Sequence, residues 1–381
     1  MLTRLFPSRM RLFITLGSAL VLLLVAVPTM VFAYPRQAAS SSHSSFYQQT
    51  NLVSDVAGMA QFTDPNLVNA WGLASSSSSP WWVADNGTGV ATLYNGQGQA
   101  FPLSSPLVVT VPPPGGSPAG TTAAPTGIVF NSTSGFQVSQ SGNSGKSFFI
   151  FDTEDGTISG WNPNVNLKSA VLAVDNSASS AVYKGLAIGS TEAGTFIYAT
   201  NFHAGRIEVY NSQFARVHLS GSFTDPDLPA HYAPFGIKNL GGKLYVTYAV
   251  QNAAKHDDVA GPGHGFVDVY NTNGHLLRRL ISHGKLNSPW GLALAPDDFG
   301  RFSNDLLVGN FGDGHINAFN PHTGDFLGQL KDSQGNPIQI DGLWSLAFGN
   351  GAQAGATNEL FFTAGINDEK DGLFGSITSE D

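Results

Sequence analysis

A short arrangement of apolar and polar positions recurs along the chain with fixed spacing. Four mostly apolar residues lead into Asp or Asn, a Gly follows four positions later, and an aromatic residue and an Asn begin five positions after that Gly. The four clear copies contain Asp85, Asp152, Asn201 and Asn310. An apolar run that ends in a polar turn residue is typical of a buried β-strand and its turn. The pattern therefore predicts a series of similar antiparallel strand pairs.

A second element precedes each copy, because a Gly followed by an apolar run predicts a further strand. The sequence Trp-Gly-Leu-Ala, for example, occurs at both Gly72 and Gly291. The six glycines are Gly72, Gly127, Gly185, Gly236, Gly291 and Gly342, at intervals of 55, 58, 51, 55 and 51 residues. Units of this length match the four-stranded blades of a β-propeller. Six such units fill the chain from about residue 65 to its end.

The last unit supplies an independent check on this count. It provides strands over 343–348, 360–363 and 373–377, and then the chain ends one strand short. The strand-like segment 47–56 precedes the first unit and has no other partner, so it could complete the last blade and remove the exposed edges of an open ring. We predict an all-β fold, a six-bladed β-propeller of four-stranded antiparallel blades over residues 46–381, with the last blade closed by the N-terminal strand. An open β-sandwich fits the uniform period less well.

The first 33 residues have the features of an export signal. Three Arg residues precede the apolar segment 12–27, and the small residues around Ala33 resemble a cleavage site. Pro28 would end a helix just before that site, which favours a cleaved signal peptide over an uncleaved membrane anchor. Residues 34–45 are polar and Ser-rich and are predicted to be a disordered spacer. We expect a protein that is secreted or held in the cell envelope, with no further membrane segment.

Composition narrows the possible partners and chemistry. Residues 1–33 carry three Arg and no acidic residue, so the remainder has 15 basic and 27 acidic residues and a net charge of −12. This charge disfavours nucleic acid as a partner, because phosphate binding needs a basic surface. The chain has no Cys, which excludes disulfides, thiolate nucleophiles and Cys-ligated metal sites.

Several stretches resemble known propellers. The combination of Pro-x-Gly-Ile/Leu, a strand ending in Asp or Asn, and Gly-x-Ile before an aromatic residue resembles NHL-type six-bladed propellers. More closely, the chain is similar to one family of secreted bacterial propellers of uncharacterised function, over about residues 46 to 378. The stretches that carry this similarity include NLVSDVAG (51–58), DPNLVNAWGLA (64–74) and HDDVAGPGHGFVDVYN (256–271). The resemblance implies the fold and brings no established activity with it.

Topology predicts where a binding site would lie. In a four-stranded antiparallel blade the end of the second strand lies beside the start of the first. The loops between second and third strands therefore share one face of the ring, around the central channel, with the connections between blades. The candidate ligand-binding residues on this face are Asn69, Trp71, Asp85, Asp152, Asn201, His203, Tyr248, His256, Asp257, Trp290, Asn310 and Asn367.

Four of these candidates could also bind a metal. Asp85, Asp152, Asn201 and Asn310 offer oxygen ligands, which suit a hard cation such as Ca²⁺. Enzymes of the gluconolactonase-like propeller group use such an ion to polarise a lactone or ester carbonyl. However, Asp and Asn at strand ends also stabilise turns through their own side chains. Their repetition in four of six blades favours this structural role, so Ca²⁺ is a possible cofactor and no cofactor is certain.

The fourth unit breaks the pattern and is therefore a further candidate site. It has Tyr248 where the acidic residue is expected, followed by a long polar insertion over 251–265. Long loops on a rigid scaffold often carry function. His256 could act as a base with Asp257 or Asp258 as its orienting carboxylate, although side chains of adjacent residues usually diverge. The alternative is a solvated, Gly-rich lid.

Two functional hypotheses follow. The first is a non-catalytic exported propeller that binds an extracellular small molecule, glycan or protein; it rests on the channel-facing aromatic residues and the lack of a catalytic triad. The second is a metal-dependent hydrolase or lactonase with its site at the central channel. A quinone-dependent dehydrogenase has no clear support in the sequence. We expect a monomer in either case, and the fold alone does not choose between the hypotheses.

Overall fold

The computed structural model describes residues 46–380. The predicted signal peptide (1–33) and spacer (34–45) lie outside the described residues. Within residues 46–380, no helix is both long enough and apolar enough to cross a membrane. The described part of the chain is built almost entirely of short antiparallel strands.

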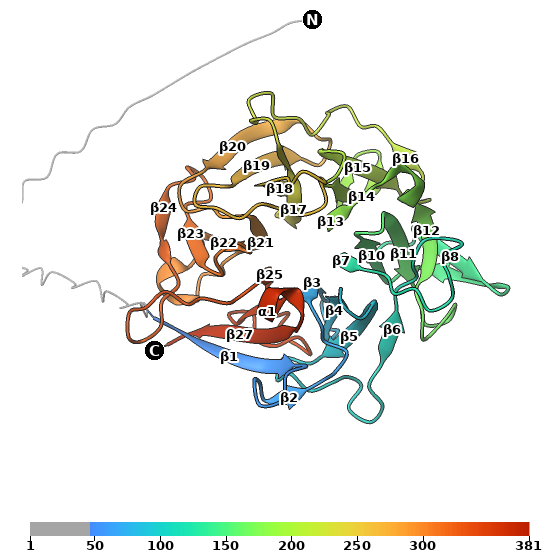
Figure 1. The fold of residues 1–381 in the computed structure, drawn as a ribbon, viewed down its shortest axis with the longest axis horizontal. Helices are drawn as coiled ribbons and strands as arrows, with labels where there is room; N and C mark the ends of the chain where they lie inside the picture. The colour runs from blue at the N-terminus through green and yellow to red at the C-terminus, as the bar shows by residue number, and fades with distance from the viewer. Residues whose placement is uncertain (1–45, 381) are drawn as a thin grey trace, which may run out of the picture. The chain divides into compact units, whose positions relative to one another are not determined.

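Six sheets are arranged around a common centre (Figure 1). In each blade we call the strands a to d from the centre outward. The first blade contains β3 (Ala70–Ala74), β4 (Trp81–Asp85), β5 (Val90–Tyr94) and β6 (Val108–Thr110). The second contains β7 (Pro125–Phe130), β10 (Phe149–Thr153), β11 (Thr157–Trp161) and β12 (Val171–Asp175). The third contains β13 (Tyr183–Thr191), β14 (Gly194–Asn201), β15 (Arg206–Asn211) and β16 (Arg216–Val217).

The other three blades continue the ring in chain order. The fourth contains β17 (Tyr232–Leu240), β18 (Lys243–Val250), β19 (Phe266–Asn271) and β20 (Leu276–Ser282). The fifth contains β21 (Pro289–Leu294), β22 (Leu306–Asn310), β23 (Ile316–Phe319) and β24 (Phe326–Gln329). The sixth contains β25 (Leu343–Phe348), β26 (Leu360–Ala364), β27 (Leu373–Ser379) and β1 (Tyr47–Ser54). The predicted six-bladed propeller is confirmed.

A few short elements lie outside the four strands of each blade. The hairpin β8 (Gln137–Gln140) and β9 (Asn143–Lys146) lies between strands a and b of the second blade, and β2 (Phe62–Thr63) pairs with the outer edge of β1. The helices are single turns: η1 (Ser177–Ser179), η2 (Gly300–Phe302) and α1 (Ile366–Glu369). Of these, α1 lies in the b–c loop of the sixth blade and therefore on the face predicted to carry the site.

The N-terminal strand closes the ring, as predicted. β1 is antiparallel to β27, with a register that runs from Tyr47 opposite Ser379 to Ser54 opposite Leu373. The a strands contact one another in the cyclic order β3, β7, β13, β17, β21, β25 and back to β3. Closure thus joins the two ends of the described chain in one sheet and leaves no open seam between the first and last blades.

The repeated Gly of strand a has a packing role. A Cβ added to Gly72 would lie 2.3 Å from the carbonyl oxygen of Thr126 in the next blade, and one added to Gly127 would lie 2.3 Å from the backbone nitrogen of Leu186. At these two positions the backbones of neighbouring blades approach one another more closely than a side chain permits. Apolar residues fill the wedges between neighbouring blades, in six clusters that each join two blades.

The sixth unit corrects one detail of the sequence interpretation. Ala70, two residues before Gly72, pairs with the last residue of strand b, Asp85. In the sixth blade the corresponding partner of Ala364 is Leu343, which makes Ser345, and not Gly342, the counterpart of the repeated Gly. Gly342 instead precedes the strand in a left-handed conformation with φ of 61°. The sequence Trp-Ser-Leu-Ala at 344–347 is the true copy of the motif.

Candidate functional site

Aromatic side chains fill the central channel at the end where the loops between strands b and c lie. We call this end of the channel the mouth. The rings of Trp71 and Trp344 stack with centroids 3.5 Å apart, and Trp290 meets both edge-on at 6.3 and 5.9 Å. Phe235 and Phe202 belong to the same buried cluster. Four of these five residues immediately precede the repeated Gly or its counterpart Ser345. The motif position before the Gly therefore places its side chain in the channel.

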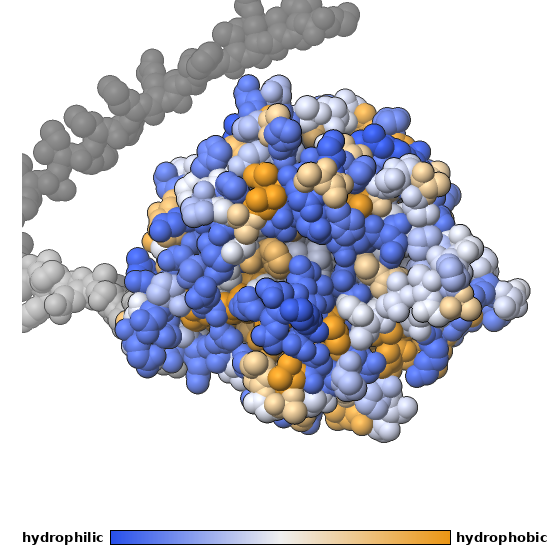
Figure 2. Space-filling model, in the orientation of Figure 1, coloured by the Kyte–Doolittle hydropathy of each residue, from blue (hydrophilic) through white to orange (hydrophobic). Residues whose placement is uncertain are grey.

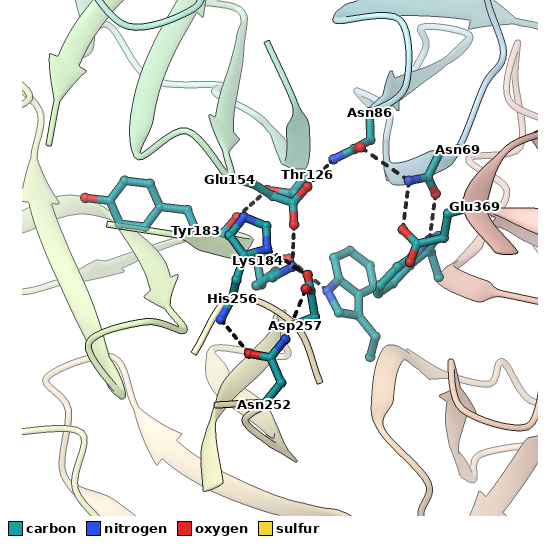
Figure 3. Close-up of polar contacts among 12 residues, drawn as sticks. Asn69, Asn86, Thr126, Glu154, Tyr183, Lys184, Asn252, His256, Asp257 and Glu369 are labelled. Atoms are coloured by element: carbon teal, nitrogen blue, oxygen red, sulfur yellow. Dashed lines mark hydrogen bonds and ion pairs between the residues drawn. The ribbon is translucent and has the colours of Figure 1, made fainter. Parts of the chain in front are cut away.

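Lys184 occupies this position in the third blade and brings a charge into the plug. Its side chain is 3% exposed, its ammonium group lies 5.1 Å from the ring centroid of Trp71, and its carbonyl accepts a 2.8 Å hydrogen bond from the indole N–H of Trp290. The ammonium forms an ion pair with Glu154 of the second blade and lies 3.5 Å from a carboxylate oxygen of Asp257 of the fourth. Three blades thus meet at one buried cation (Figure 3).

Hydrogen bonds extend this contact toward the first and sixth blades (Figure 3). The amide of Asn86 donates to Glu154 at 2.9 Å, and the amide of Asn69 donates to Asn86 at 3.2 Å and to Glu369 of α1 at 2.8 Å. The indole of Trp344 donates to the oxygen of Asn69 at 3.2 Å. Side chains from five blades therefore form one continuous polar network across the mouth, and Trp290 ties in the remaining blade.

The long insertion of the fourth blade lies over this network, as predicted. The Nδ1 atom of His256 is 2.7 Å from Asp257, although side chains of adjacent residues seldom meet in this way. Asn252 holds the other oxygen of the same carboxylate at 3.2 Å. His256 and Asp257 are 47% and 60% exposed, so a ligand in solution can reach them.

Carboxyl groups outnumber cations at the mouth. Burial raises the pKa of Glu369, although the hydrogen bond from Asn69 opposes this shift. Burial likewise raises the pKa of Asp258. Burial would also raise the pKa of Asp257, but the hydrogen bond with His256 and the charge of Lys184 outweigh it and hold that pKa below its usual value. The polar surface over α1 and its surroundings is visible in Figure 2.

The four residues proposed as Ca²⁺ ligands are each bonded within their own blade or to the connection leading into it. Asp85 accepts from the hydroxyl of Thr92 at 2.8 Å. Asp152 accepts from Thr126 and from the backbone N–H of Gly127, and burial raises its pKa to about 7. Asn201 donates to Glu208, and Asn310 donates to the carbonyl of Lys285 and to Asp313. One buried oxygen each of Asp85, Asp152 and Asn310 has no hydrogen-bond partner among the described residues.

The remaining candidates divide between the mouth and the blades. Asn69, Trp71, His256, Asp257 and Trp290 belong to the network or the plug described above. Tyr248 is buried in the blade and shares a 2.7 Å hydrogen bond with Tyr270. The carbonyl of His203 is 3.4 Å from the amide of Gln251, at the base of the insertion. Asn367 is exposed and donates to Asp371 at 2.8 Å.

Comparison with known proteins gives relatives but no activity. No family model matches the chain. An uncharacterised protein of Acanthamoeba polyphaga mimivirus is 33% identical over 336 residues, which cover 86% of this chain and 79% of the relative. A second uncharacterised protein of the same virus is 30% identical over 354 residues, covering 91% and 88% respectively. The chain belongs to the family of these mimivirus proteins.

The fold of this family has a counterpart among solved structures. A catalytically inactive virginiamycin B lyase from Staphylococcus aureus, crystallised with quinupristin, superposes with a TM-score of 0.50 at 11% identity, covering 87% of this chain and 98% of the lyase. Identity this low shows a shared propeller architecture and nothing of the chemistry. The relatives found for the family are viral, and membership in an NHL-type bacterial group stays a prediction.

The sequence alone did not identify two residues of the mouth, Lys184 and Glu369. Lys184 was visible only as part of the strand motif, yet it stands where Trp71, Phe235 and Trp290 stand in other blades. Four of the six blades have an aromatic residue at this position and the second blade has Thr126, so the single charged residue was the available signal. Glu369 lies in a segment that does not match the repeat. It meets Asn69 only because ring closure brings the sixth blade next to the first.

Proposed function

We propose that the protein is an exported recognition module of the NHL-like type, whose mouth binds the positively charged group of an extracellular small molecule, glycan or protein. The observation that carries this proposal is the imbalance of charge around Lys184. Its ammonium contacts Glu154 and Asp257 and also interacts with the charges of Asp258 and Glu369. A surplus of partly desolvated carboxylates attracts a cation more strongly than the same groups would in water.

A pair of oligosaccharides tests this proposal. The hexasaccharide of glucosamine carries ammonium groups, whereas the hexasaccharide of N-acetylglucosamine has the same backbone without them. We expect calorimetry at low salt to detect binding of the charged sugar only. Asp257→Asn should weaken it about fivefold, which corresponds to about 1 kcal/mol for a partly exposed charge pair.

Asp298→Asn is the matched control for this experiment. Asp298 is exposed in the loop between β21 and β22, on the opposite face of the ring, and its substitution removes the same charge. Equal weakening by both substitutions would indicate a general effect of net charge. Equal binding of both sugars would contradict recognition through a cationic group.

A second candidate function, metal-dependent hydrolysis, is favoured by one cluster. Glu154, His256 and Asp257 offer ligand atoms that all lie within 4.8 Å of one another. A set of two carboxylates and one imidazole suits Zn²⁺ or Mn²⁺ better than Ca²⁺, which prefers oxygen ligands. A bound ion would act as a Lewis acid on a carbonyl. The ammonium of Lys184 contacts both carboxylates and would compete with it.

Thermal unfolding in the presence of Zn²⁺, Mn²⁺ and Ca²⁺ separates the two functions. An ion that binds the folded protein raises the unfolding temperature by mass action. Under the second function we expect a rise with Zn²⁺ or Mn²⁺ that disappears in His256→Ala and persists in His322→Ala, whose exposed side chain lies between β23 and β24. No rise with any ion would remove the hydrolase from consideration.

A further inference from the structure

The end of the channel opposite the mouth contains a cavity. It has a volume of about 500 Å³, within the range of about 300–1,000 Å³ that is typical of pockets for small molecules. Its wall consists of strand-a segments such as Leu186–Ile188 and Leu292–Leu294, where the chain runs away from the mouth. A narrow waist lined in part by Trp290 and Leu292 separates this cavity from the aromatic plug. We call it the lower cavity.

The wall of the lower cavity is mostly apolar; Ser75 and Asn239 are polar, and Lys238 is the one charged residue among those that line it. Two residues after the repeated Gly, or after Ser345, five blades carry Ala or Val at 74, 129, 187, 293 and 347, and the fourth blade carries Lys238. Lys238 lines both the waist and the lower cavity. Its ammonium forms no ion pair or hydrogen bond with any residue between 46 and 380, and none of the residues that line the cavity is acidic. Its charge therefore has no partner within the channel wall.

An ammonium group in such surroundings is costly unless an anion accompanies it. Burial lowers the pKa of Lys238 to about 8, so the amine is still mostly protonated at neutral pH. Strongly hydrated anions such as phosphate would lose water in the cavity and gain few partners, because the Asn239 amide already donates to the carbonyl of Ile188 and its oxygen accepts from the N–H of Gly242. A monoanion with an aliphatic tail satisfies both parts of the site: its carboxylate pairs with Lys238 and its tail covers the Leu, Ile and Ala side chains.

We propose that the lower cavity binds an aliphatic monocarboxylate, with its headgroup at Lys238 and its tail along the channel wall. This site lies at the other end of the channel from the mouth and does not depend on the function proposed there. It uses residues of all six a strands, so it exists only in the closed ring. No other side chain of the wall could supply the charge.

Calorimetric titration with decanoate at pH 7 tests the proposal on the folded protein. We expect saturable binding of decanoate and at least tenfold weaker binding of decan-1-ol, which has the same chain without the charge. Lys238→Met keeps a long apolar side chain and should weaken decanoate binding at least tenfold while leaving decan-1-ol unchanged. Lys243→Met is the matched control, since Lys243 is exposed at the start of β18 in the same blade.

Chemical protection gives a second readout that needs no variant. Acetylation of lysines by a water-soluble ester, followed by peptide mass spectrometry, should show slower modification of Lys238 with decanoate present and no change at Lys243. Decanoate that binds Lys238→Met as tightly as the unchanged protein would overturn the proposal. Absence of saturable binding, or unchanged acetylation of Lys238, would do the same.

Discussion

Replacing Tyr47 by alanine is expected to lower the free energy of unfolding by about 3–5 kcal/mol, the range for truncating a large buried aromatic residue. Tyr47 is the first residue of the closing strand β1 and is 1% exposed. Its ring packs against Phe299 and Phe302 of the fifth blade at 4.9 and 6.0 Å. Its hydroxyl donates to the carbonyl of Phe299 and accepts from the N–H of Phe302, both at 3.1 Å. Truncation leaves a cavity and unpaired polar groups at the seam.

Chemical denaturation of three variants separates these contributions. Tyr47→Phe removes only the hydroxyl and should cost about 1–2 kcal/mol. Gln48→Ala is the control, because Gln48 is the exposed neighbour in the same strand. If Tyr47→Ala were no more destabilising than Gln48→Ala, the closing strand would not be anchored to the fifth blade as described.

Gly127→Ala is expected to destabilise the fold by about 3 kcal/mol, at the upper end of the range for overpacking. The added methyl group would lie 2.3 Å from the backbone nitrogen of Leu186 in the next blade and 2.7 Å from the carboxylate of Asp152. The Leu186 backbone belongs to a strand held on both sides by its own ladder and by the neighbouring blade, so it cannot move aside cheaply. The same change should also disturb the 2.7 Å hydrogen bond from Gly127 to Asp152.

Two further substitutions make this result specific to the channel. At Gly115 the nearest atom to an added Cβ is 3.4 Å away, so Gly115→Ala should change the unfolding midpoint little. Ser345 is the side chain that the sixth blade carries at the position equivalent to Gly127. Because Ser345 already fits there, Ser345→Gly should relieve no clash and should not raise the unfolding midpoint. Equal tolerance of alanine at Gly127 and Gly115 would show that blade spacing does not require the glycine.

Much of the architecture was predictable because the repeat encodes it. The predicted strand 343–348 agrees with β25, and the predicted closing segment 47–56 contains β1. The predicted position of the repeated Gly in the sixth unit was wrong, because Ser345 stands at that position and Gly342 lies three residues before it. Sequence spacing alone cannot distinguish a glycine required for close approach from one required for a left-handed turn, since both roles use the same residue.

The sequence predicted on which face of the ring the mouth lies, but it predicted few of the side-chain contacts there. His256 and Asp257 could be placed there because their insertion is long and the topology of a blade fixes where a b–c loop lies. The ion pair between Lys184 and Glu154 joins two blades, and nothing local in either segment specifies the other. Lys238 carried no signal except as a charged residue in an apolar strand, which commonly indicates an exposed edge. Its location inside the channel follows from strand a alone.

Ring closure by β1 also has a consequence for the order in which the chain can fold. Tyr47 and Ser379 are partners in one ladder, yet nearly the whole described chain separates them. Joining ends this distant costs more loop entropy than any contact within a blade, and folding slows as native contacts become less local. The blades can form as each hairpin completes, but the last sheet must wait for both ends. We therefore expect seam formation to be the final and slowest event of folding, with β1 left without its partner β27 until the last blade forms.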